Sequence, residues 1–158
     1  MNHGPDHWHP NPAFFYQPGA GPLFDVGVYH LTHLVNHLGP IAAVRAVAHT
    51  THRERTVPFG DLAGTKIPVA VPTHIVCHLS FVAGAQIVLT SSFDVWKHAH
   101  QPFEFYGDEG TAVRFFHDLP PDPAPFFYCP KDRAGRRHDR CHRHRPRAAL
   151  RGREVLLL

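Results

Sequence analysis

Hydrophobic residues in the segment 22–38 recur at spacings of three and four, which is the period of an amphipathic α-helix. They are Leu23, Val28, Leu31, Leu34, Val35 and Leu38. A glycine-rich turn with Pro22 in the first helical turn marks the start, and Gly39-Pro40 supplies a terminal glycine followed by a helix breaker. The pattern predicts one helix over residues 22–38.

Alternating and β-rich runs follow this helix. Residues 41–50 directly follow the helix stop and are predicted as a strand. Residues 73–82 and 85–95 flank an Ala-Gly turn at Gly84, the pattern of an antiparallel hairpin. In the first arm, apolar residues alternate with polar ones, so one face of the sheet is expected to be wet or to cover a ligand.

A further hairpin is predicted for residues 102–107 and 111–116, joined by an acidic turn. One helix followed by hairpin-linked strands is typical of an α+β fold, with an open, mainly antiparallel sheet packed against helix 22–38. Strands do not alternate with helices, which argues against a doubly wound nucleotide-binding fold.

The sequence changes character near Leu119. Residues 131–154 hold ten Lys and Arg against three acids, whereas the rest of the chain holds six against ten. The proline- and arginine-rich segment 119–158 has no usable periodicity, and we expect it to be a disordered basic tail after a domain of residues 1–118. The abrupt break also suggests the hypothesis of a frameshift.

Composition excludes several classes of protein. No apolar run reaches the roughly 20 residues that a membrane helix needs, and the polar start resembles no secretory signal. The three cysteines are odd in number and irregularly spaced, which favours reduced thiols and a cytoplasmic protein without membrane contact. The basic tail lacks interleaved aromatic residues, so no specific nucleic-acid partner is expected.

Three segments together carry a family resemblance. They are WHPNPAFFYQPGAGPLFDVGVYHLTHLVNHLGPI, VPTHIVCHLSFVAGAQIVLTSSFDVW and PFEFYGDEGTAVRF. Their combination resembles the C-terminal domain of the Gfo/Idh/MocA oxidoreductases over roughly residues 3–118. The resemblance implies the substrate-binding half of an NAD- or NADP-dependent sugar or polyol oxidoreductase, and a homo-oligomer formed through the sheet face.

The resemblance also implies catalytic roles for Asp25 and Tyr29 in the helix beside the sugar site. Their spacing of four puts them on one helix face, and a carboxylate at this end gains from the helix dipole. The alternative is purely structural: Asp25 favours the first turn, and Tyr29 packs in the core. Many members of the family have histidine at the Tyr29 position, and His30 lies next to it.

Other expected substrate contacts come from the N-terminal loop and the same helix. The predicted set is Trp8, His9, Tyr16, Gln17, Gly21 and His30. The alternative for the loop residues is a surface segment fixed by prolines.

The family's dinucleotide-binding half has no counterpart in these residues. A G-x-G-x-x-G motif must follow a strand, but GAGPLF at 19–24 has phenylalanine in the third glycine position. The family's Glu-Lys-Pro motif is also missing. We therefore expect no NAD or NADP to be bound by this chain alone, and the chain alone to be inactive.

Two other functions stay open at this stage. One is a non-enzymatic interaction module that pairs with a full-length paralogue. The other is a histidine-rich metal binder, because His30, His33 and His37 are spaced three and four apart. No acid or cysteine completes that set locally, so no metal site is assigned.

Overall fold

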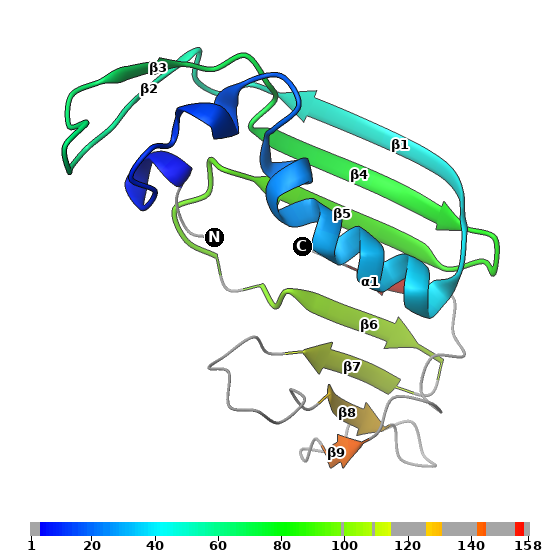
Figure 1. The fold of residues 1–158 in the computed structure, drawn as a ribbon. Coiled ribbons are helices and arrows are strands. Elements are labelled where there is room, and N and C mark those ends of the chain that lie inside the picture. Colours follow the sequence, from blue (N-terminus) through cyan, green and yellow to red (C-terminus); the bar gives the residue numbers. More distant parts are fainter. Residues whose placement is uncertain are drawn as a thin grey trace. The chain divides into compact units, whose positions relative to one another are not determined.

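The structure is a computed structural model (Figure 1). It describes residues 4–98, 100–108, 110–114, 126–130, 142–144 and 154–156. The chain divides into two compact units. The first comprises Met1–Gly39, Arg45–Cys77 and Thr90–Ala99, and the second comprises Pro40–Val44, His78–Leu89 and His100–Leu158.

Four helical segments open the first unit. Two short 3₁₀ helices, η1 (Pro5–His7) and η2 (Ala13–Tyr16), are followed by a π-helical turn η3 (Leu23–Gly27) and helix α1 (Val28–Leu38). The predicted helix 22–38 is therefore confirmed in extent, although its first turn is π-helical. It ends at Gly39, whose positive φ of 84° closes the helix without the steric cost that other residues incur.

Helix α1 buries less of its apolar stripe than the periodicity predicts. Leu34 is fully buried, whereas Val28 and Val35 are each 42% exposed. Val28 and Val35 thus lie at the surface of the helix.

The predicted strand and hairpin over residues 41–95 are confirmed. They form β1 (Ile41–His49), β4 (His74–Phe81) and β5 (Gln86–Ser92), with a tight turn in which the Phe81 amide bonds to the Ala85 carbonyl at 2.9 Å. Alternation on β4 is as predicted, since Cys77, Leu79 and Phe81 are buried and the intervening residues are not.

The last predicted hairpin is also present, as β6 (Phe103–Gly107) paired antiparallel with β7 (Gly110–Arg114). Three further short strands are β8 (Phe126–Pro130), β9 (His142–His144) and β10 (Glu154–Leu156). The strand order among the described residues is β1-β4-β5-β10-β6-β7-β8-β9, and β10 runs parallel to β5 but antiparallel to β6. The α+β class with a mainly antiparallel open sheet is confirmed.

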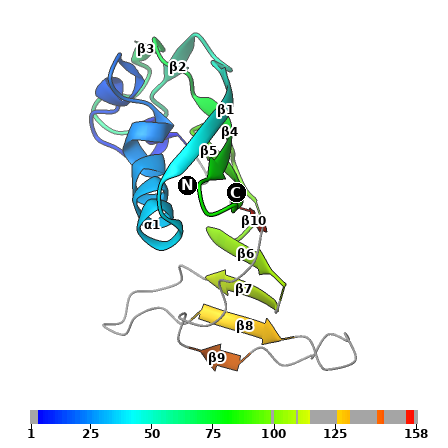
Figure 2. The ribbon, with the colours of Figure 1, turned by 90° about the vertical axis from the view of Figure 1, so that its right-hand side faces the viewer.

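The sequence pattern does not predict one element of the first unit. Strands β2 (Glu54–Thr56) and β3 (Lys66–Pro68) pair antiparallel into a small separate sheet, which lies beside the short N-terminal helices (Figures 1 and 2). This β2–β3 arm contributes Val57 and Ile67 to a core cluster. The cluster also contains Phe15, Tyr16 and Phe93.

Most of segment 119–158 lies outside the described residues, so its predicted disorder stays a prediction. In the part of the chain that is described, no helix combines the length and apolar character needed to cross a membrane.

Candidate functional site

Hydrogen bonds from two other segments and one bond within it fix the start of the helix. Ser91 at the end of β5 donates its hydroxyl to the Pro22 carbonyl at 2.8 Å, and the Asp25 amide donates to Gly21 at 3.0 Å. Gly21 itself has a φ of +97° and donates its amide to the Phe15 carbonyl at 3.0 Å. The π-helical turn that carries Asp25 is therefore held from the strand on one side and the loop on the other.

Asp25 is a partly buried carboxylate with an unused oxygen. Its Oδ2 is shielded from solvent, yet it has no hydrogen-bond partner among the described residues. Burial raises the pKa of the Asp25 carboxyl, and the charge of nearby His9 acts in the opposite direction. A buried polar atom without a partner is unfavourable for folding, so a native protein that keeps one usually has a specific reason, such as a functional role or contact with a water or an ion.

Tyr29 lies in the first turn of α1, four residues after Asp25, and its side chain is 67% exposed. This exposure contradicts the structural alternative in which Tyr29 packs in the core. Phe24, next to Asp25 in η3, is 68% exposed. The start of the helix thus presents two accessible aromatic rings, Phe24 before Asp25 in the sequence and Tyr29 after it.

The N-terminal loop holds the ring of His9 firmly. The Asn11 amide donates to His9 Nδ1 at 3.0 Å, and the same nitrogen lies 2.8 Å from the Asn11 carbonyl. The ring also makes edge contacts with Trp8, Phe14 and Phe15, at centroid distances of 5.5, 5.3 and 5.1 Å. Trp8 and Phe14 are themselves about half exposed, at 46% and 54%.

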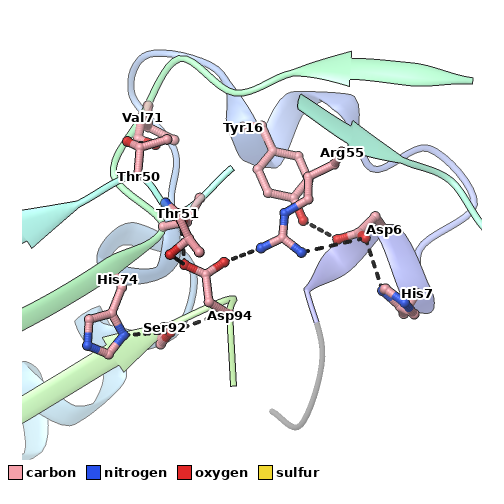
Figure 3. A network of polar contacts seen from close by, with 11 residues as sticks. Asp6, His7, Tyr16, Thr50, Thr51, Arg55, Val71, His74, Ser92 and Asp94 are labelled. Carbon is pink, nitrogen blue, oxygen red and sulfur yellow. Dashed lines mark hydrogen bonds and ion pairs between the residues drawn. The ribbon is translucent and has the colours of Figure 1, made fainter. Parts of the chain in front are cut away.

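A buried polar network anchors this loop to the rest of the first unit (Figure 3). Tyr16 donates its hydroxyl to Asp6, and the Arg55 guanidinium lies between Asp6 and Asp94. Its Nη1 is 3.9 Å from Asp6 Oδ2, and its Nη2 donates to Asp94 Oδ1. The loop, the β2–β3 arm and the segment after β5 therefore meet at one cation.

The same carboxylates accept further bonds. Thr51 and Thr73 each donate to Asp94 Oδ2 at 2.6 Å, and His7 Nδ1 lies 3.0 Å from Asp6 Oδ2 (Figure 3). Neither aspartate relies on Arg55 alone for its contacts. Sequence reasoning missed this network, because its members carry no local motif.

The structure places the other predicted substrate contacts in environments that differ from one another. Tyr16 is 0% exposed and bonded to Asp6, which makes it a core residue. Burial, reinforced by the bond to Asp6, raises the pKa of its phenol. Gln17 is partly exposed, and its side-chain amide donates to the Pro68 carbonyl at 3.3 Å. His30 is partly buried, with Nδ1 at 3.1 Å from the Val26 carbonyl, and burial lowers its pKa.

The glycine turn at 19–24 does not fit a dinucleotide. A Cβ atom added at Gly21 would meet the Pro72 carbonyl and Val71 at 3.4 Å, so protein already occupies the side that a pyrophosphate would approach. The Gly21 amide is bonded to Phe15. Phosphate recognition at such a turn needs free backbone amides and open space, and Gly21 offers neither, although the position of Gly19 is open.

No group of three or more potential metal ligands comes together within the described ranges of the chain. His37 Nδ1 lies 2.7 Å from the His33 carbonyl, and the two rings are 6.3 Å apart. The histidine spacing on the helix therefore gains no support as a metal site.

Comparison with known proteins identifies the family. A family model described as the GFO/IDH/MocA C-terminal domain matches residues 1–113. This chain belongs to the GFO/IDH/MocA family. No curated protein matches it.

Solved structures with the same fold include oxidoreductases. A levoglucosan dehydrogenase in complex with NADH and L-sorbose is 23% identical, with a TM-score of 0.63, and the match covers 89% of this chain. An NAD binding oxidoreductase from Klebsiella pneumoniae is 26% identical, with a TM-score of 0.60 over 78% of this chain. An oxidoreductase domain protein from Kribbella flavida is 20% identical, with a TM-score of 0.58 over 86%.

This GFO/IDH/MocA chain spans only part of those proteins. The matches cover 37%, 31% and 38% of the three structures, respectively. The fold is shared, and the activity of a whole oxidoreductase comes to this chain only as a proposal.

Replacing Asp25 with asparagine is expected to make the protein more resistant to unfolding as the pH rises. Because burial raises the pKa of Asp25, the folded state binds this proton more tightly than the unfolded chain. Stability in the wild type is retained below the ordinary aspartate pKa of 3.8 and falls as the pH rises from there towards the raised value. An asparagine side chain at this position does not titrate, so the variant escapes this loss.

Urea unfolding of both proteins between pH 4 and 8 measures the effect. Asp61→Asn, at an exposed position of the loop in the β2–β3 arm, controls for the loss of one carboxylate. An Asp25→Asn variant whose advantage does not grow with pH would show that this carboxyl is not destabilised in the folded state.

Proposed function

We propose that this chain is the substrate-binding half of an NAD- or NADP-dependent sugar or polyol oxidoreductase. The observation that carries the proposal is the pair formed by Asp25 and Tyr29. Asp25 contributes a shielded carboxylate oxygen without a partner among the described residues, and Tyr29, four residues further along, contributes an accessible phenol. Family membership supplies the reaction class, and solved structures with the same fold include a dehydrogenase in complex with NADH and L-sorbose.

The chemistry of the surface around this pair supports a polyhydroxylated ligand. A sugar presents hydroxyl groups, which both donate and accept hydrogen bonds, and apolar C–H faces that pack on aromatic rings. Asp25 offers an acceptor for a hydroxyl proton, and Tyr29 offers a hydroxyl that donates or accepts. Exposed aromatic rings lie in the same two segments: Trp8 and Phe14 in the N-terminal loop, and Phe24 at the start of the helix.

A raised pKa suits Asp25 to hold a substrate hydroxyl. A carboxylate that water solvates poorly gains more from accepting a hydrogen bond than an exposed one does. Tyr29 then orients the same substrate from one turn further along. Trp8, Gln17 and His30 remain proposed contacts at the edge of this surface, whereas the buried Tyr16 and Gly21 support it from beneath.

We assign no step of the reaction to a dinucleotide in these residues, because the turn at 19–24 does not fit one. The proposal is that a Rossmann domain outside these 158 residues supplies the nucleotide and that the chain alone is inactive. Domain limits of 1–118 and 119–158 belong to the same proposal; the family match itself ends at residue 113.

Oligomer formation and compartment are further parts of the proposal. Val44, Val47 and Val76 on β1 and β4 are 58%, 75% and 36% exposed, and such apolar strand positions favour burial against another copy. The buried, free thiol of Cys77 fits a reducing compartment such as the cytoplasm.

The test is a titration of the ¹⁵N-labelled 158-residue chain with L-sorbose, followed by NMR. We expect shift changes confined to residues of the N-terminal loop and the helix start. Asp25→Asn should weaken binding by about tenfold or more, because a hydrogen bond to a charged group contributes about 1.5–3 kcal/mol. Tyr29→Phe should weaken it by about three- to tenfold.

Tyr106→Phe is the matched control, since Tyr106 is a 40% exposed tyrosine on β6 whose hydroxyl bonds to Glu104. It should bind like the wild type. Absence of L-sorbose binding at concentrations up to 0.5 M, on the order of the weakest specific sugar sites, contradicts the proposed substrate class. Binding that survives Asp25→Asn contradicts the proposed site.

A further inference from the structure

Both tryptophans of the chain lie at the surface of the first unit. Trp8 in the N-terminal loop is 46% exposed, and Trp96, which follows β5, is 65% exposed. The core cluster of this unit is filled instead by other aromatic rings, among them Phe15 and Phe93. Tryptophan is enriched at binding surfaces, because its ring offers a large apolar face together with a polar N–H group. Trp96 has no role in the site described so far.

The ring of Trp96 is held against the N-terminal loop. It meets the ring of His7 edge-on, at a centroid distance of 4.9 Å and an interplanar angle of 81°. His7 Nδ1 lies 3.0 Å from Oδ2 of Asp6, a carboxylate that is only 2% exposed. Two residues before Trp96, the carboxylate of Asp94 accepts a hydrogen bond from Arg55. The indole ring and the backbone that carries it therefore both rest on the buried network.

Trp8 and Trp96 present two separate aromatic rings to the solvent. Trp96 contacts His7, whereas Trp8, the next residue of the loop, contacts the rings of His9 and Phe15 at 5.5 and 5.7 Å. The two indoles thus come from different chain segments and have different neighbours. Their supports are nevertheless consecutive residues, whose Cα atoms lie about 3.8 Å apart. The surface around Trp96 is therefore an extension of the surface around Trp8.

The residues beside Trp96 suit a ligand with hydroxyl groups better than an apolar protein surface. Lys97 and His98 follow it directly and are exposed, so the ring does not continue into an apolar patch along this segment. The ammonium group of Lys97 and the indole N–H group are hydrogen-bond donors. A sugar ring has an apolar C–H face and a rim of hydroxyl oxygens, which match an aromatic face with donors beside it.

We infer that Trp96 stacks against a second sugar unit, so that the ligand of this surface is a disaccharide or another glycoside rather than a single sugar. The first unit lies against Asp25, Tyr29 and Trp8, and the next one packs on the face of Trp96. This inference rests on the proposed function and narrows its substrate class.

The experiment compares L-sorbose with maltose and cellobiose, two disaccharides of different linkage, in NMR titrations of the 158-residue chain. The better of the two disaccharides should bind about two- to tenfold more tightly than L-sorbose, the range that one aromatic contact gives. Trp96→Ala should remove this advantage and leave L-sorbose affinity unchanged. Phe59→Ala is the matched control, because Phe59 is a 53% exposed ring in the β2–β3 arm and should change neither affinity.

Tryptophan fluorescence gives a second readout. Trp8→Phe keeps an aromatic ring in the loop and leaves Trp96 as the single tryptophan of the chain. Disaccharide binding to this variant should shift the emission to shorter wavelength, because a sugar face displaces water from the indole. L-sorbose, which occupies only the first position, should leave the emission unchanged.

The outcomes separate the two proposals. L-sorbose binding without tighter binding of either disaccharide overturns the role of Trp96 and leaves the proposed function standing. A Trp96→Ala variant that keeps the disaccharide advantage, or that loses L-sorbose affinity to the same extent, also overturns it. No binding of L-sorbose by the wild type overturns the proposed function and, with it, this inference.

Discussion

Replacing Arg55 with methionine is expected to lower the free energy of unfolding by about 3–5 kcal/mol. The Arg55 side chain is 12% exposed and lies between two carboxylates, of which Asp6 is 2% and Asp94 is 10% exposed. Methionine has a similar length but no charge, so both carboxylates would remain buried without their cation. Three segments that meet at the guanidinium would also lose their common contact.

Urea denaturation followed by circular dichroism measures this loss. Arg55→Lys keeps the charge but cannot bond to two carboxylates with a planar fork, so its stability should lie between those of the wild type and Arg55→Met. Lys66→Met is the matched control, because Lys66 pairs with Glu54 on the neighbouring strand and is largely exposed. Equal stability of Arg55→Met and Lys66→Met would rule out the buried network as a main source of stability.

Replacing Phe93 with alanine is expected to cost about 3–5 kcal/mol. Phe93 is 1% exposed, and its ring meets Phe15 and Tyr16 edge-on at centroid distances of 6.3 and 5.8 Å. Its backbone amide is bonded to Thr73 at 2.8 Å. Tyr16 cannot move into the cavity without losing its hydrogen bond to Asp6.

Thermal unfolding of Phe93→Ala is compared with that of Phe59→Ala, a change of the same kind at a position that is 53% exposed in the β2–β3 arm. Only the first variant should show a large drop in melting temperature. A small drop for Phe93→Ala would mean that the cluster repacks around the missing ring.

The helix and the longer strands could be predicted because their patterns are local. Spacings of three and four indicated residues 22–38, and alternation in β4 indicated both the strand and its buried face. The β2–β3 arm could not be predicted in this way, because each of its strands has only three residues. Three residues are too few for an alternation to stand out from chance.

The same distinction between local patterns and long-range contacts applies to the candidate site. Asp25 and Tyr29 could be put forward as candidates because a motif and a helical spacing join them. Arg55 and Asp94 could not, since their contact spans 39 positions and neither residue belongs to a motif. Tyr16 was expected among the substrate contacts from its place in the loop, but its bond to Asp6, ten positions away, makes it part of the core.

The π-helical turn η3 has a consequence for the helix as a whole. Such a turn holds one residue more than an α-helical turn, so the residues before it and those after it are out of phase by one position. The helix face that carries Asp25 therefore does not have to coincide with the face on which Leu34 is buried. Deleting a single residue from Leu23–Gly27 would restore one continuous phase and make a more regular helix. It would also turn Asp25 relative to the buried side of the helix, so the irregular turn sets how the proposed binding residues lie relative to the core.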